Sequence, residues 1–162
     1  MVDEQNGASA NGNGADDAGA ASIQVVGQYL KDVSFESPKA PQSLKAPGNN
    51  PNLQVDIHVN VNKLEENTYE SAIQIKAHAS NDDGTIYLME AVYAGAFEIN
   101  NIPADALEPI LLINCPTILY PFLRRIISDL TQEGGFPPLL LDPIDFSKLY
   151  QQRQAEQKQG TA

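Results

Sequence analysis

The stretch Leu107–Leu130, LEPILLINCPTILYPFLRRIISDL, decides the fold of this chain. Its apolar side chains recur at helical intervals, which predicts a helix whose apolar stripe is wider than one covering layer needs. Pro109 suits the first turn, whereas Pro116 and Pro121 should kink or break the helix. The extra width of the apolar stripe indicates that the helix contributes both to the core and to a surface that binds apolar partners. The stripe comprises positions 107, 111, 115, 118, 119, 122, 123, 126, 127 and 130.

An apolar loop follows this helix. Gly134 and Gly135 should end the helix, and Phe136–Leu141 (FPPLLL) then places bulky side chains in a segment that prolines keep irregular. Loops normally run over the surface of a protein. The bulk of this loop must therefore pack on a core, on another subunit or on a ligand.

Four segments before the helix alternate apolar and polar side chains, as half-buried strands do. The turn signal Asp82-Asp83-Gly84 joins the third and fourth segments, and so short a connection forces antiparallel pairing. The fourth segment is apolar on both faces. We therefore expect the protein's own helices on one face and a second copy of the chain as a candidate for the other. The segments are 23–36, with loose alternation, 53–62, with strict alternation, 69–79 and 85–99.

A second helix should follow the loop. Asp142 is placed to cap it, Pro143 suits its first position, and it should run to about residue 157. Four strands followed by two helices indicate an α+β fold, in which a four-stranded antiparallel sheet carries the two helices on one face.

Composition separates one folded domain from two tails. Residues 1–21 consist mainly of Ala, Gly, Asn, Asp and Ser with almost nothing to bury, so they should be disordered. Residues 22–150 should form a domain with its own core. Residues 151–162 should form a frayed helix end and a polar tail.

The chain carries a formal net charge of −11, and most of its acidic residues lie in the predicted domain. An acidic surface repels nucleic acid and anionic lipid and favours basic partners. The alternative is that this charge is the ordinary acidity of a soluble protein and says nothing about partners.

Several features predict a soluble, cytoplasmic protein. The single cysteine excludes an internal disulfide and fits a reducing compartment. No signal-peptide pattern follows Met1. The longest uncharged stretch, residues 109–123, is shorter than the roughly 20 residues that cross a membrane.

The sequence shows no arrangement typical of an enzyme or a metal site. Asp56 and His58 share the polar face of one predicted strand, but a third ligand is missing, so we interpret them as solvated strand-face residues. Cys115 has no histidine near it in sequence, which indicates a buried thiol rather than a nucleophile. Neither a Gly-rich phosphate loop nor a G-x-S-x-G or Cys-x-x-Cys motif occurs. We expect no catalysis, no cofactor and no metal, and the alternative is a small enzyme with an unrecognised site.

Three blocks carry a further signal: Gln28–Pro38 (QYLKDVSFESP), Asn114–Arg124 (NCPTILYPFLR) and Gly135–Phe146 (GFPPLLLDPIDF). Together they resemble the protein-export chaperone family SecB. The similarity runs in one order from about residue 23 to residue 150 without large gaps, and the tails lie outside it.

The resemblance implies an ATP-independent chaperone, or holdase, that keeps unfolded precursor proteins competent for export from the cytoplasm. It implies a homotetramer built as a dimer of dimers, with the sheets outside and the long helices at the centre. It also implies delivery of clients to the motor SecA, without nucleic-acid binding or direct insertion into a membrane. The alternative is a SecB-like chaperone that serves a non-secretory client, such as a toxin–antitoxin system.

Members of the family present an acidic sheet surface to SecA, and the resemblance places that role on four residues. Asp32 and Glu36 lie on the first predicted strand, and Leu88 and Glu90 lie on the fourth. Each pair is separated by an even number of positions, so its members share a strand face. The alternative for the acids is an ordinary solvated face.

The candidate client-binding residues are apolar ones from the loop, the long helix and the segment between positions 41 and 51. The family often carries aromatic residues in that segment, where they help to line the client groove. This chain has only Leu44 as a large apolar residue there, and it has no tryptophan. The alternative is that the candidates only roof the protein's own core, above all Phe136. The candidates are Leu44, Tyr120, Phe122, Phe136, Leu139, Leu140 and Leu141.

Overall fold

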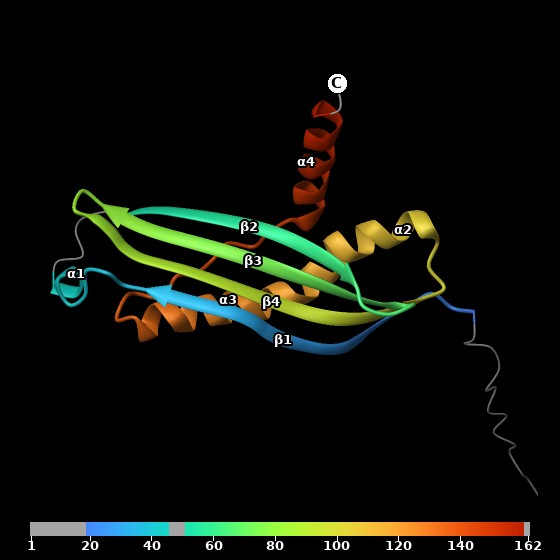
Figure 1. The fold of residues 1–162 in the computed structure, drawn as a ribbon, viewed down its shortest axis with the longest axis horizontal. Helices are drawn as coiled ribbons and strands as arrows, with labels where there is room; N and C mark the ends of the chain where they lie inside the picture. Colours follow the sequence, from blue (N-terminus) through green and yellow to red (C-terminus); the bar gives the residue numbers. More distant parts are fainter. Residues whose placement is uncertain (1–18, 46–50, 161–162) are drawn as a thin grey trace, which may run out of the picture.

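The computed structural model describes residues 19–45 and 51–160. Four antiparallel strands form one sheet in the order β1-β4-β3-β2. Figure 1 shows the sheet as a long twisted layer, with α3 behind one face and α4 projecting away from it. The predicted α+β fold is confirmed. The elements are β1 (Ser22–Glu36), α1 (Gln42–Lys45), β2 (Asn52–Lys63), β3 (Thr68–Asn81), β4 (Gly84–Asn100), α2 (Ala104–Pro109), the π-helical turn η1 (Ile110–Asn114), α3 (Cys115–Glu133) and α4 (Phe146–Gln159).

The loose alternation of the first strand has a structural cause. The register of β1 against β4 shifts at Val26 and at Lys31, which are extra residues relative to β4. Such β-bulges change the face on which the following residues lie. Residues 32–36 then pair with β4 without interruption, so the even-numbered residues of that segment share one face.

The core lies between the sheet and the long helix, on the side to which the odd-numbered residues of β3 and β4 point. Ser71 Oγ donates a 2.9 Å hydrogen bond to the carbonyl oxygen of Leu111 and so ties β3 to η1. A Cβ on Gly95 would lie 2.9 Å from Leu119 Cδ2, so the glycine permits the close approach of α3 to β4. Among the largest fully buried side chains are Ile73, Ile75, Met89, Phe97, Leu119, Leu123 and Ile127.

The long helix does not break at its prolines. The helical run Ala104–Glu133 is continuous, and α3 passes through Pro121. Just before Pro116 the helix widens into η1, where Cys115 N–H donates to the carbonyl of Ile110, five residues back. Pro116 has no N–H, and its ring crowds the carbonyl four residues earlier, so a wider turn lets the helix continue. The helix therefore does not break at either proline, and the irregularity expected at Pro116 takes the form of η1.

The same helix is apolar over more than its buried side. Within the described ranges it is the one helix that is long and apolar enough to cross a membrane by length and composition. Core helices of soluble proteins pass this test as well. Here 39% of the most apolar window is buried. The surplus of apolar surface predicted from the sequence is therefore present.

The last helix begins three residues later than predicted. Asp145, and not Asp142, is its N-cap, and Asp145 Oδ1 accepts hydrogen bonds from two backbone N–H groups of the first turn, at 3.0 and 3.2 Å. The carbonyl of Asp142 instead accepts a 2.5 Å hydrogen bond from the hydroxyl of Tyr120, which fixes this part of the loop on α3. The helix continues to Gln159, through most of the predicted C-terminal tail. The division into one domain and two tails stays a prediction, because residues 1–18 and 161–162 lie outside the described residues.

Candidate functional site

The sheet face that points away from the helices, here called the outer face, carries four of the predicted site residues: Asp32, Glu36, Leu88 and Glu90. Strand register sets rows of side chains across the sheet, and three adjacent rows hold all four. The structure therefore brings these residues together, while their role stays a prediction. The three rows, called the central rows and given in the order β2-β3-β4-β1, are Gln54–His78–Leu88–Glu36, Asp56–Lys76–Glu90–Ser34 and His58–Gln74–Val92–Asp32.

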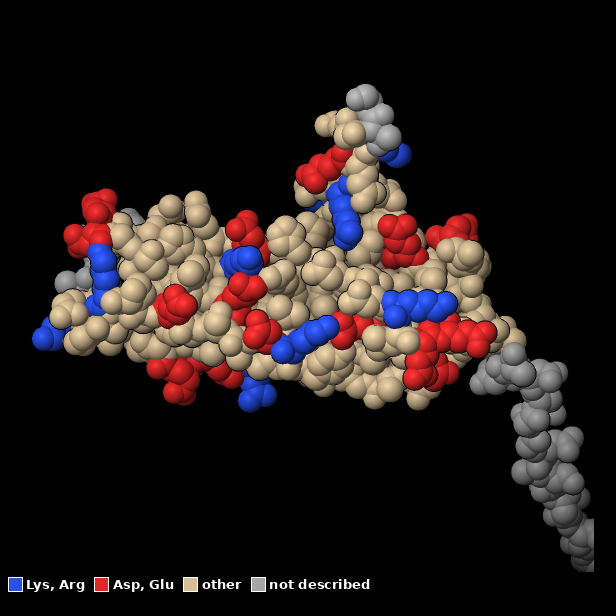
Figure 2. Space-filling view, viewed as in Figure 1, with Lys and Arg blue, Asp and Glu red and all other residues tan. Residues whose placement is uncertain are grey.

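Acidic side chains of the central rows are open to solvent. Figure 2 looks onto this face and shows acidic side chains spread along the sheet with basic ones between them. Asp32 and Glu36 are exposed, and no ion pair or side-chain hydrogen bond involves either carboxylate in the part of the chain that the structure describes. Leu88, which lies opposite Glu36, is 42% exposed. An exposed apolar side chain among unpaired acids suits a basic partner with an apolar contact at its centre.

Glu90 differs from the other two acids because β3 holds its carboxylate. Gln74 Nε2 donates to Glu90 Oε1 at 2.5 Å, and Lys76 Nζ lies 3.9 Å from Glu90 Oε2. Neither partner was predicted from the sequence. The signal that could have found them is strand alternation, which places Gln74 and Lys76 on one face of the third strand.

A second polar cluster on the outer face is centred on Glu70 of β3. Glu70 is only 5% exposed. Lys31 Nζ forms an ion pair with Glu70 at 2.7 Å, the hydroxyl of Tyr29 donates to the same carboxylate, and Asn62 Nδ2 donates at 3.4 Å. Burial by itself would raise the pKa of Glu70, but the hydrogen bonds from Lys31, Tyr29 and Asn62 outweigh it and lower the pKa. Burial and the bond to Glu70 raise the pKa of Tyr29 to about 12. Glu70 therefore links β1, β3 and β2 across the sheet.

Glu70 makes the stability of the fold depend on pH. Because its pKa is lowered in the folded chain, its contribution is present above the unfolded pKa of about 4.3 and is lost as the pH falls through the folded pKa. We expect Glu70→Gln to cost about 1–2 kcal/mol at neutral pH, since charged hydrogen bonds are replaced by neutral ones. The difference from the wild type should shrink as the pH falls below the unfolded pKa and through the lower folded pKa. Thermal unfolding over a pH series measures it, with Glu98→Gln on the same face as the control, and a difference that does not change with pH would refute the assignment.

The apolar loop after α3 lies partly inside the core. Gly134 and Gly135 end the helix as predicted. Phe136 is 9% exposed, and its ring centroid lies 5.0 Å from that of Tyr87 and 6.4 Å from that of Phe35. Leu44 of α1 packs over Gly135. The structure thus joins the segment after β1 to the loop after α3 around one aromatic cluster.

The seven candidate client residues differ widely in exposure. Tyr120 and Leu141 are buried, as Phe136 is, and Leu139 packs partly buried against the core. Leu140 is 73% exposed, and Leu44 is 42% exposed. The buried members fit the interpretation that they roof the core, whereas Leu140 and Leu44 are open to a client.

Phe122 belongs to a different surface, on the helix side of β1. Its ring stacks on Tyr93 with 6.1 Å between centroids, and Tyr93 lies opposite Leu30 in the sheet. The apolar side chains along β1 and α3 on this side are each about two-fifths exposed or more, which is a large apolar area for a lone subunit. We call this surface the β1–α3 strip; it comprises Ile23, Val25, Leu30, Val33, Ile118 and Phe122.

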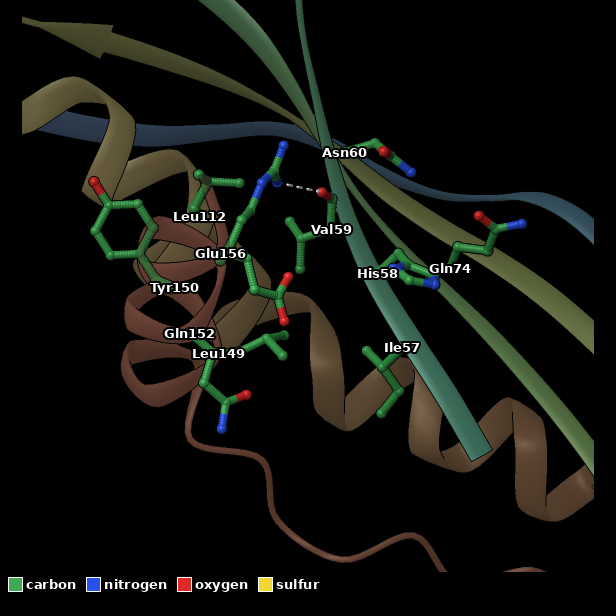
Figure 3. Close-up of a pocket in the computed structure, with 11 residues that line it drawn as sticks. Ile57, His58, Val59, Asn60, Gln74, Leu112, Leu149, Tyr150, Gln152 and Glu156 are labelled. Atoms are coloured by element: carbon green, nitrogen blue, oxygen red, sulfur yellow. Dashed lines mark hydrogen bonds between the residues drawn. The ribbon is translucent and has the colours of Figure 1, made fainter. Parts of the chain in front are cut away.

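A hollow of about 530 Å³ lies between β2 and the start of α4. Figure 3 shows Leu112 and Leu149 on its helix side and His58 and Gln74 towards the sheet. The dashed line in that view marks the 3.1 Å hydrogen bond from Arg153 Nη1 to the carbonyl of Val59, which ties α4 to the edge strand. The predicted site residues do not line this hollow.

Two features bear on chemistry. Cys115 is fully buried, and burial raises the pKa of its thiol to about 12, which fits a buried thiol rather than a nucleophile. In residues 19–45 and 51–160, no group of three or more His, Cys, Asp or Glu side chains is placed to hold a metal ion.

Comparison with known proteins decides the family. The family model described as preprotein translocase subunit SecB matches residues 16–157. The chain belongs to the SecB family. It is 46% identical over 140 residues to the protein-export protein SecB of Xanthobacter autotrophicus, covering 86% of this chain and 90% of that protein. It is 44% identical over 157 residues to SecB of Parvibaculum lavamentivorans, covering 97% and 93% of the two chains.

A solved structure shares the fold at lower similarity. The SecB-like chaperone of Mycobacterium tuberculosis, solved with a peptide from an antitoxin, matches with a TM-score of 0.64 at 17% identity and covers 75% of this chain and 90% of that one. The predicted SecB resemblance and fold are confirmed, as is the expectation of a chaperone for protein export. SecB proteins form a family of chaperones, and the match spans all of the predicted site residues.

Proposed function

We propose that this chain holds unfolded secretory precursors in the cytoplasm, without ATP, cofactor or catalytic site, and delivers them to SecA. The observation that carries the proposal is the grouping of Asp32, Glu36, Leu88 and Glu90 in the central rows of a SecB-family sheet. Relatives at 44–46% identity are named protein-export proteins, whereas the antitoxin-binding neighbour shares the fold alone. That difference favours secretory clients over a toxin–antitoxin role.

Assembly into a homotetramer, as a dimer of dimers, would cover the β1–α3 strip. Val33 and Leu30 on β1 and Phe122 on α3 leave apolar surface that one subunit cannot bury. Closed symmetric assemblies bury the same patch on every subunit. Placing this strip between subunits, and not the outer face of β4 for which the sequence suggested a second copy, leaves the outer face free for a partner.

Client binding would use exposed apolar side chains rather than a sequence-specific pocket. Leu140 and Leu44 offer such a surface near the Phe136 cluster, and the loop that carries Leu140 is tied to α3 through Tyr120. Burial of apolar area does not require a defined client sequence. One surface of this kind can therefore serve many unfolded precursors.

Calorimetry of an unfolded precursor tests this mode of binding. We expect a negative heat-capacity change, because apolar surface leaves water on binding. Leu140→Ser should weaken binding by about three- to tenfold with the assembly intact. Complete burial of a leucine by a client would contribute about 1.5–3 kcal/mol, and we expect the client to bury Leu140 only in part. Leu64→Ser, at an exposed turn residue, is the matched control. A heat-capacity change near zero, or equal effects of the two variants, would contradict the proposal.

A further inference from the structure

Lys76 occupies the middle of the central rows. Its row runs Asp56–Lys76–Glu90–Ser34 across all four strands, so the lysine lies between two carboxyl-bearing residues. Lys76 Nζ is 3.9 Å from Glu90 Oε2, and the two side chains are 53% and 33% exposed. The pair is therefore a solvent-accessible contact that can open, unlike the 2.7 Å contact of Lys31 with Glu70, whose carboxyl side chain is only 7% exposed.

Both oxygens of Glu90 have partners within the subunit. Gln74 Nε2 donates to Oε1, and Lys76 lies beside Oε2. In the described ranges, Asp32 and Glu36 have no such side-chain partners. Of the three acids in the proposed SecA surface, Glu90 is thus the one that the free subunit already neutralises in part.

We propose that Lys76 is an internal competitor for Glu90 that weakens docking of the basic partner. This inference rests on the proposed function of the outer face. A cationic group that approaches Glu90 must displace the Lys76 ammonium or bind next to a like charge, and either course lowers the affinity. Displacement is feasible because exposed ion pairs contribute little and the lysine side chain is flexible.

Asp56 offers the displaced Lys76 ammonium a second carboxylate to pair with. It lies opposite Lys76 on β2, and neighbouring strands are separated by roughly 4.8 Å. When a partner takes Glu90, the ammonium can turn towards Asp56 without leaving the row. The arrangement keeps docking reversible, which a chaperone needs if it is to separate from SecA after transfer of the client.

The experiment measures SecA binding to the full chain carrying Lys76→Met or Lys76→Gln, at low and high salt. We expect both variants to bind about two- to fivefold more tightly at low salt, a change as small as the free energy of an exposed ion pair. The gain should disappear at high salt, which screens the charges. Lys63→Met is the matched control: it removes the same charge, and its pairing with Tyr69 places it on the opposite sheet face. An unchanged or weaker affinity for the Lys76 variants would overturn the inference, as would an equal gain for Lys63→Met.

A double-mutant cycle separates this inference from the proposed function. Glu90→Gln should weaken SecA binding, and Lys76→Met should bring a smaller gain in the Glu90→Gln background than in the wild type. An undiminished gain would show that Lys76 does not act through Glu90. If Glu90→Gln leaves the affinity unchanged, Glu90 takes no part in docking and the role of Lys76 is wrong. The docking surface itself is then decided by Asp32→Lys and Leu88→Ala, which do not involve Glu90.

Discussion

Reversing two charges of the central rows, as Asp32→Lys with Glu90→Lys, should weaken SecA binding by about tenfold to a hundredfold at low salt. Asp32 is exposed and Glu90 takes part in a solvent-accessible ion pair, and charges of this kind contribute little to folding, so the assembly should survive. Attraction between opposite charges mainly sets the association rate, so the loss should appear in the on-rate and shrink as salt rises, since the screening length is about 10 Å at 0.1 M and about 3 Å at 1 M. Leu88→Ala should instead speed dissociation at both salt concentrations, because it removes an apolar contact.

Glu98→Lys provides the matched control for these reversals. Glu98 lies on the outer face of β4 but outside the central rows, and it pairs with Gln24 and Thr68. A loss of affinity as large as that of the double reversal would show that net charge, and not the central rows, governs binding. Normal SecA affinity in the double reversal, with client binding intact, would place docking elsewhere.

The second large effect concerns assembly. Light scattering should give a tetramer for the wild type at micromolar concentration, and Val33→Asp with Phe122→Asp should dissociate it into smaller species. Both side chains belong to the β1–α3 strip, and a carboxylate buried without a partner costs several kcal/mol. Leu64→Asp places the same charge at an exposed turn and should leave the tetramer intact. A monomeric wild type would refute the proposed assembly.

Regular patterns in the sequence were enough to predict the sheet. Residues 53–62 alternate strictly because β2 has no bulge, and the Asp82-Asp83-Gly84 signal marks the turn between β3 and β4. Bulges are the part that alternation could not reveal. The β3–β4 register shifts between Ala79 and Ser80, and without this shift Lys76 would lie opposite Met89 rather than Glu90.

The ends and irregularities of the helices depend on competing local contacts. Asp142 and Asp145 both precede segments that could form a first helical turn. In the structure Asp145 is the N-cap, and the Asp142 carbonyl accepts a hydrogen bond from Tyr120 instead. The position of Pro116 indicated that the helix would be irregular there. The form of the irregularity, a π-helical turn, depends on tertiary packing that the sequence pattern does not show. Helix boundaries of this kind are fixed by tertiary contacts more than by propensity.

The site was predicted unevenly for the same reason. Even spacing placed Asp32 with Glu36, and Leu88 with Glu90, on shared strand faces, and the observed register joins the two pairs. In the irregular loop no period separates the residues that face the core from those that face solvent. Phe136 and Leu141 are buried there, and Leu140 is exposed, although all three are apolar residues of one short segment.

The most direct test of the central claim is to isolate the chain from its own cells with its bound polypeptides and to sequence those polypeptides. We expect enrichment of unfolded precursors that still carry N-terminal signal peptides, in amounts that fall with Leu140→Ser and do not fall with Glu90→Lys. Bound polypeptides without signal peptides, such as a single antitoxin, would contradict it.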